Sequence, residues 1–120
     1  MASKREVRVR RIYEQPGPQD GTRVLVDRLW PRGLAKGRAR LDEWCKQVAP
    51  STALRNWYGH DPERFEEFRR RYRAKLQEPE RAAALGHLRA LARERPLTLL
   101  TASRHPDVSH AMVLAELLRA

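Results

Sequence analysis

The chain has 120 residues, 41% of them hydrophobic, which suffices for one domain with a buried core but not for two. It has 25 Lys and Arg residues against 15 Asp and Glu, a net charge of +10, and one cysteine, which excludes an intrachain disulfide. No apolar run approaches the roughly 18 residues of a membrane-spanning helix. We therefore expect a single cytoplasmic domain over residues 1–120 with no membrane contact. The basic N-terminus lacks the apolar region of a signal peptide. We expect residues 1–5 to form a flexible basic tail that leads into the first strand.

The positive charge is nearly all arginine, and it has two interpretations. Arginine binds phosphate through a planar fork of donors, so a basic surface favours phosphate-bearing partners. Alternatively, chains rich in arginine, alanine and leucine are common products of GC-rich genomes, and the charge then says nothing about a ligand. Composition alone does not decide between the two.

Three strands are predicted in the first 48 residues. Alternating valine and arginine predict a strand at 6–13, which a Pro/Gly-rich loop at 15–21 ends. The continuous apolar run Val24–Val26 predicts a second strand covered on both faces. A third strand is predicted at 44–48.

Helices are predicted over most of the following residues. Ser51 caps a short helix that Gly59 ends. Asp61 and Pro62 begin a second helix that runs to about residue 76, and Pro79 opens a third that ends near residue 95. Apolar side chains recur at spacings of three and four in both, as in helices with one buried face.

The C-terminal part predicts a strand at 97–101 and a final helix over about 108–119, capped by the residues 105–107. The order of strands and helices predicts an α/β fold with a central, largely parallel sheet of about four strands flanked by helices. The alternative is an α+β arrangement in which the first two strands form a hairpin.

Ligands of open α/β sheets bind beyond the carboxyl ends of the strands. Segments 27–33, 49–52 and 101–105 each follow a predicted strand, so a parallel sheet would bring them to one edge. Arginine side chains and helix N-termini at that edge would favour an anion. The polar residues that we expect there are Asp27, Arg28, Arg32, Ser103, Arg104 and His105.

Within this edge, Arg28 and Arg32 are predicted to hold the anion, and Asp27 to orient Arg28 or a ligand hydroxyl. Trp30 would stack on the ligand or shield it. Each has a structural alternative, in which Asp27 caps a turn or pairs with an arginine and Trp30 and Pro31 only shape the sheet edge. Ser51, Ser103 and Arg104 complete the predicted ligand-binding set.

His60 precedes a helix and is the predicted acid or base, together with Asp27, if a reaction is catalysed. The alternative is that His60 packs against Trp57; Asp61 is best explained as a helix cap. No glycine-flanked elbow surrounds Ser103, which argues against a Ser/His hydrolase. The histidines and Cys45 lack the spacing of a metal site, and the sequence identifies no cofactor.

Three stretches carry a resemblance to a known family: "RVLVDRLWPRGL", "VAPSTALRNWYGHDPERFEEFRRRY" and "LTLLTASRHPDVSHAMVLAELL". They resemble the YeaO-like branch of domain-of-unknown-function family 488 over about residues 7–118. The resemblance implies a small, single-domain, cytosolic α/β protein of bacteria or archaea and implies no reaction. It marks residues 27–33 as a family motif, together with Pro50, Ser51, Trp57, His60 and Asp61.

The last stretch departs from the pattern of the family. Relatives carry an aromatic residue at the position of Thr101, an acidic residue at His105 and a His-Asn pair at Val108 and Ser109. If the family histidine served catalysis, this chain has lost it or replaced it with His105 or His110.

Three hypotheses follow. The first is a domain that binds a phosphate-bearing ligand, a nucleotide or nucleic-acid end, at the strand carboxyl edge, with or without catalysis. The second is a non-enzymatic nucleic-acid binder that uses a diffuse arginine surface, including Arg5, Arg8, Arg10 and Arg11. The third is a structural or interaction protein with a buried Asp27–Arg28 pair. The ligand and the oligomeric state, including a homo-oligomer, stay open.

Overall fold

The computed structural model describes residues 6–120, so the predicted tail at 1–5, with Arg5, lies outside the described residues. Its centre is a parallel sheet of four strands in the order β1-β4-β2-β3. The strands are β1 (Val7–Arg11), β2 (Thr22–Leu25), β3 (Glu43–Trp44) and β4 (Leu97–Thr101). The predicted α/β class is confirmed. The hairpin alternative is wrong, because β4 lies between β1 and β2 and pairs in parallel with both.

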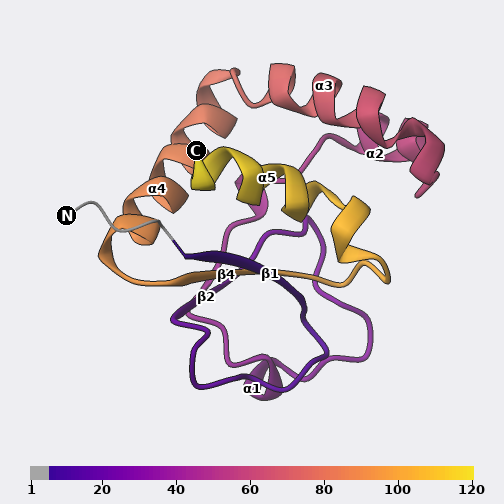
Figure 1. The fold of residues 1–120 in the computed structure, drawn as a ribbon. Coiled ribbons are helices and arrows are strands. Elements are labelled where there is room, and N and C mark those ends of the chain that lie inside the picture. The colour runs from indigo at the N-terminus through magenta and orange to yellow at the C-terminus, as the bar shows by residue number, and fades with distance from the viewer. Residues whose placement is uncertain (1–5) are drawn as a thin grey trace.

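Helices cover the sheet mainly on one side. They are α1 (Lys36–Ala39), α2 (Thr52–Tyr58), α3 (Phe65–Lys75), α4 (Pro79–Glu94) and α5 (His110–Arg119). Single 3-10 turns occur at Lys46–Val48, Pro62–Arg64 and Pro106–Val108. Figure 1 shows α3, α4 and α5 above the sheet, with α5 nearest to it, and the short α1 below it. None of the helices within residues 6–120 is long and apolar enough to cross a membrane.

The core lies on both faces of the central strand β4, whose five residues are all buried. The larger cluster fills the space between the sheet and the helical layer, where Tyr58, Phe68 and Tyr72 stack in series. A smaller cluster under the sheet is built on Leu25 and Leu100 and includes the partly buried Trp30 and Trp44. Burial on both faces explains why β2 and β4 are continuous apolar runs rather than alternating ones.

The predicted helix caps in the middle of the chain are confirmed. The Ser51 hydroxyl accepts a hydrogen bond from the Leu54 N–H, and Gly59 ends α2 in the left-handed conformation with φ of 56°. The Asp61 carboxylate accepts from the Glu63 N–H, and Pro62 follows it as predicted. These caps place the α2–α3 corner beside the end of the sheet.

The predicted strand at 44–48 is wrong in extent, because only Glu43 and Trp44 pair with β2. The Cys45 N–H still donates to the Leu25 carbonyl, after which the backbone turns and Lys46–Val48 form a 3-10 turn. That turn buries Val48 in the main core, where its carbonyl accepts from the Tyr72 hydroxyl at 2.5 Å. Burial of Val48 therefore ends the strand early.

The last helix also begins differently from the prediction. Residues 105–107 do not cap it: His105 precedes a separate 3-10 turn, and α5 starts at His110. Ser109 stands at the N-terminus of α5, but its hydroxyl donates backwards to the Pro106 carbonyl at 2.7 Å. This difference brings His110, rather than residue 108, to the end of the sheet. The four-residue helix α1 was not predicted, since it is too short to show a period.

Candidate functional site

A cavity of about 750 Å³ opens at the carboxyl edge of the sheet. Its walls come from the loops after β2 and β4, from residues 49 and 50, from the α2–α3 corner and from the start of α5. The Val26 N–H donates to the Leu100 carbonyl at 3.1 Å, so the two central strands stay paired up to the cavity. The predicted site residues that line it are Asp27, Arg28, Trp30, Arg32, His60, Ser103 and Arg104.

Asp27 holds the inner end of this cavity. One carboxylate oxygen, Oδ2, accepts from the Ala102 N–H at 2.8 Å and so ties the end of β2 to the loop after β4. The other, Oδ1, is buried and accepts no hydrogen bond from residues 6–120. It faces His110 Nε2 at 3.4 Å, and that nitrogen donates to the Val26 carbonyl at 2.9 Å. Asp27 thus contacts His110 rather than Arg28. The other predicted role of Asp27, orienting a ligand hydroxyl, stays a prediction.

Arginine dominates the wall of the cavity. Of the residues that line it, only Asp27 is acidic, whereas the arginines are Arg28, Arg32, Arg55 and Arg104. All of these arginines are exposed, and none forms an ion pair with a carboxylate among residues 6–120. The cavity therefore carries a local excess of positive charge.

Arg28 points across the mouth of the cavity rather than into the core. It is exposed, and its guanidinium donates to the Thr52 hydroxyl at the start of α2. The buried Asp27–Arg28 pair that a purely structural role would need is therefore not formed. Arg28 links two walls of the cavity while its other donors stay available.

Trp30 packs at the edge of the sheet, in the smaller hydrophobic cluster. Its indole N–H donates to the Leu34 carbonyl at 2.8 Å, and its ring meets that of Trp44 edge-on with centroids 5.4 Å apart. Trp44 in turn donates to the Asp27 carbonyl at 2.8 Å. The tryptophans thus close the lower cluster, which agrees with the structural interpretation of Trp30, although Trp30 also lines the cavity.

The loop after β4 is held by its own polar groups. The Ser103 hydroxyl accepts from the His105 N–H at 3.3 Å, and the Ser103 N–H donates to the Thr101 hydroxyl at 3.2 Å. From β1, Arg11 Nε donates to the Ser103 carbonyl at 3.1 Å. These contacts present Ser103 and Arg104 at the mouth without any contact between Ser103 and a histidine ring.

His60 lies at the outer wall with φ of 58°, a conformation that few residues other than glycine adopt. Its ring is exposed and 6.4 Å from that of Tyr58. It does not pack against Trp57, whose ring lies instead beneath Arg71 and Arg64. His60 does not contact Asp27, so the two predicted catalytic residues line one cavity without meeting.

Ser51 is the predicted site residue that the structure leaves out. It does not line the cavity, and its hydroxyl caps α2. Arg55 of the same helix does line the cavity and was missed, because a basic residue on a short helix is ordinarily solvated surface. His110 was named only as a possible replacement for the family histidine, and its contact with Asp27 was not predicted. Its place directly after the loop that follows β4 was the available signal.

Tyr58 forms the wall between α2 and the loop before α5. Its hydroxyl donates to the Val108 carbonyl at 2.5 Å, and burial raises the pKa of the phenol, as do the nearby Asp61 and Asp107. The backbone of Val108, where the family resemblance implies a histidine, therefore anchors the loop. The Val108 side chain offers no polar group.

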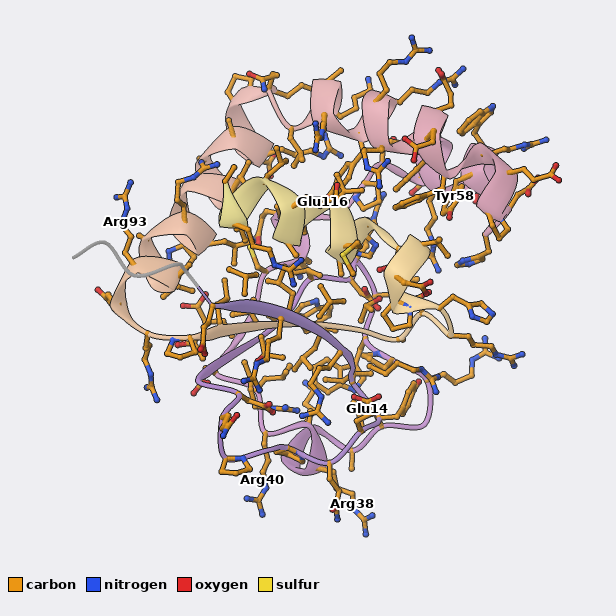
Figure 2. The ribbon with its side chains drawn as sticks, viewed as in Figure 1. Glu14, Arg38, Arg40, Tyr58, Arg93 and Glu116 are labelled. Atoms are coloured by element: carbon orange, nitrogen blue, oxygen red, sulfur yellow. The ribbon has the colours of Figure 1, made fainter. Side chains whose placement is uncertain are left out.

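Some of the other arginines, on α3 and at Arg10 of β1, differ from those of the cavity because they pair with carboxylates. On α3, Arg69, Arg70, Arg71 and Arg73 pair with Glu66, Glu67 and Glu116. On β1, Arg10 pairs with Glu14 and Asp20, and Arg8 donates to Gln19. Figure 2 shows Arg38 and Arg40 projecting at the α1 end and Arg93 from α4, on separate sides of the molecule.

Side chains that commonly bind metals do not cluster within residues 6–120. Within residues 6–120, no group of three or more His, Cys, Asp or Glu side chains is placed to hold an ion. Cys45 is buried and unpaired, and burial raises the pKa of its thiol.

The fold is that of a small α/β domain with a parallel sheet and a cavity at the strand ends. The chain is a member of domain-of-unknown-function family 488: the family model described as the inactive DUF488-N3 subclade matches residues 6–120. The chain is 52% identical over 118 residues to uncharacterised proteins of Mycobacterium tuberculosis and Mycobacterium bovis, covering 98% of each chain. It is 40% identical over 114 residues to the uncharacterised protein YeaO of Escherichia coli, covering 95% of this chain and 97% of YeaO. No solved structure matches the chain.

Proposed function

We propose that the protein binds a phosphate-bearing ligand, a nucleotide or a nucleic-acid end, in the cavity at the carboxyl edge of the sheet. The observation that carries this proposal is the charge of the cavity: its arginines have no acidic partners among residues 6–120, and Asp27 is its one carboxylate. Guanidinium groups bind phosphate oxygens through two parallel hydrogen bonds. An ion in the cavity would supply the countercharge that these side chains lack.

The inner part of the cavity suits a ligand with an apolar or aromatic portion. Trp30, Tyr58 and Phe68 contribute ring surface to the lining, while the arginines stand on exposed loops and on α2. Small-molecule sites are commonly apolar hollows of about 300–1,000 Å³ with a few placed polar groups, and this cavity fits that description. A nucleotide combines such a ring with a phosphate.

The proposal is for binding and does not require catalysis. The family model that matches is described as an inactive subclade, which supports a binding role. A proton-transfer role for His60 and Asp27 stays a prediction. The diffuse arginine surface of the second hypothesis has less support, because Arg10 is paired with Glu14 and Asp20 and Arg11 donates to the Ser103 carbonyl. The arginines of α3 are likewise paired with glutamates.

The test is isothermal titration calorimetry with 5′-AMP and, separately, inorganic pyrophosphate at low ionic strength. In the double variant Arg28→Gln/Arg32→Gln we expect the affinity to fall at least tenfold, because a hydrogen bond to a charged group contributes about 1.5–3 kcal/mol. The matched control is Arg38→Gln/Arg40→Gln, which removes the same charge at the α1 end. An equal loss in both variants, or no loss in the first, would overturn the proposed site.

A further inference from the structure

A second cavity of about 460 Å³ adjoins the first. The two share one wall, made of Arg28, Leu29, Ala49 and Pro50. The second cavity continues past this wall to the turn at Lys46 and Gln47 and to the first turn of α4. The hollow at the strand ends is therefore longer than the anion-binding cavity alone.

From this continuity we infer that the two cavities form one groove for the end of a single-stranded nucleic acid. The terminal nucleotide would lie in the first cavity, and the next phosphate would pass Arg28 to reach Lys46 in the second. The inference rests on the proposed function and deepens it, because it distinguishes a polymer from a mononucleotide.

The charge of the second cavity supports a continuing phosphate chain. Lys46 forms no ion pair within residues 6–120; its ammonium lies 5.0 Å from the centre of the Trp44 ring. Arg81 is already engaged, with Glu78 at 2.7 Å and the Ala49 carbonyl at 3.2 Å. Lys46 and the shared Arg28 are thus the cations available to a ligand. The opposing charge is Glu80, which is exposed on α4 and can turn toward solvent.

The wall between the cavities offers an apolar surface. Leu29 is 64% exposed and lines both cavities, beside the buried Ala49 and Pro50. A single exposed leucine is ordinary on a protein surface. Here it lies between two groups of cations, where the face of a base can cover it. Proteins that bind single strands combine backbone-binding cations with side chains, typically aromatic, on which the bases stack. In this groove Leu29 offers an aliphatic surface at the corresponding place.

A mononucleotide and an acidic peptide account less well for the groove. The first cavity alone is large enough for a small ligand, so a mononucleotide would leave Lys46 and the second cavity unused. A peptide bound in extended form would pair its backbone with an exposed sheet edge. The groove crosses the ends of the strands instead and presents side-chain donors, which match a chain of repeated phosphates.

The experiment uses a fluorescent octathymidylate as the bound probe and follows its anisotropy over a salt series. The unlabelled competitors are thymidine monophosphate and single-stranded DNA and RNA oligonucleotides of two, four and eight residues. We expect affinity to rise at least tenfold from the mononucleotide to the tetranucleotide. Lys46→Gln should reduce the slope of log affinity against log salt by about 0.7 for the octanucleotide, the value for one phosphate contact of a single strand. It should leave the affinity for the mononucleotide unchanged.

Arg93→Gln is the matched control, since Arg93 forms no ion pair within residues 6–120 and lies in the last turn of α4, away from the first turn that borders the second cavity. An affinity that does not depend on length, with mononucleotide binding intact, would overturn the groove but not the proposed function. No binding of any phosphate ligand would overturn the proposed function itself. A tetraglutamate peptide and a blunt DNA duplex are measured as further competitors. The groove also fails if Arg93→Gln lowers the slope as much as Lys46→Gln, if the peptide competes as well as the tetranucleotide, or if the duplex binds as tightly as the single strand.

Discussion

Asp27 and His110 meet at the inner end of the cavity, with Oδ1 of the carboxylate 3.4 Å from Nε2 of the imidazole. Both side chains are mostly buried, 14% and 15% exposed. Nε2 donates to the Val26 carbonyl at 2.9 Å, which fixes the ring orientation. The pair therefore joins the end of β2 to the start of α5.

Burial lowers the pKa of His110 below its ordinary value of 6.5, although Asp27 and the Val26 carbonyl oppose this shift; Arg55 and His60 add to it. Below pH 6.5 the unfolded chain consequently binds a proton more readily than the folded one. The contribution of His110 to stability is fully present above pH 6.5 and is lost as the pH falls. For one such group, the free energy of unfolding changes by at most about 1.4 kcal/mol per pH unit.

His110→Gln keeps a donor for the Val26 carbonyl and removes the titration. We expect its free energy of unfolding to fall less than that of the wild type between pH 7.5 and pH 5.5, as measured by urea denaturation. His105→Gln, at an exposed position, should behave like the wild type. A wild type that gains stability relative to His110→Gln at pH 5.5 would instead mean that the imidazolium pairs with Asp27.

Asp20 is the centre of a second buried polar network, which lies just before the start of β2. Its carboxylate is 2% exposed and accepts from the Gly17 N–H and from the guanidinium groups of Arg10 and Arg23. Asp20→Asn leaves the buried Arg23 without its countercharge. Breaking such a pair costs about 3–5 kcal/mol, so we expect a loss of that order in chemical denaturation.

The pH dependence gives a separate check on Asp20. Burial by itself raises the pKa of this carboxyl, but the hydrogen bonds from Gly17, Arg23 and Arg10 outweigh it and lower the pKa below the ordinary 3.8. Its stabilising contribution is thus present above pH 3.8 and is lost as the pH falls below that value. The stability difference between wild type and Asp20→Asn should narrow between pH 5 and pH 3; a constant difference would contradict this account.

Gly21 is required where β2 starts beside β4. It adopts φ of 65°, and a Cβ there would lie 2.0 Å from the Pro96 carbonyl oxygen, to which the Thr22 N–H donates at 2.8 Å. Gly21→Ala must therefore break this approach, and we expect a loss of more than 2 kcal/mol, seen as a lower Tm.

Gly86→Ala is the opposite case. A Cβ at Gly86, within α4, meets nothing within 4 Å. Alanine in a helix interior is about 0.5–1 kcal/mol more favourable than glycine, so this variant should raise the Tm. If Gly21→Ala also raises the Tm, the assigned backbone geometry at Gly21 is wrong; if Gly86→Ala lowers the Tm, the open space assigned to Gly86 is wrong.

The strands and caps could be predicted because each has a local cause. The run 97–101 is buried throughout and largely apolar because β4 is covered on both faces. Asp61 followed by Pro62 is a common helix start, and here it opens the 3-10 turn that leads into α3. The order of the strands could not be read locally. It depends on the insertion of β4 between β1 and β2, which joins segments more than 70 residues apart.

The sequence predicted the region of the candidate site but not which side chains contact one another within it. A parallel sheet brings the loops after β2 and β4 to one edge, so Arg28, Arg32 and Arg104 were expected together. The partner of Asp27 was not, because His110 reaches it only when α5 starts two residues later than the pattern indicates. Ser51 was assigned to the ligand for its position after a strand, yet the helix that it begins takes up its hydroxyl.

Ser51→Ala tests whether that residue acts through the fold alone. Loss of the hydrogen bond from the Leu54 N–H should destabilise the protein by about 1 kcal/mol, a typical cost for a lost N-cap, and Ser51→Thr should restore most of it. Because Ser51 does not line the cavity, the affinity for 5′-AMP measured well below the Tm should stay within about twofold of the wild type. A tenfold loss of affinity in Ser51→Ala at unchanged stability would place the hydroxyl on the ligand.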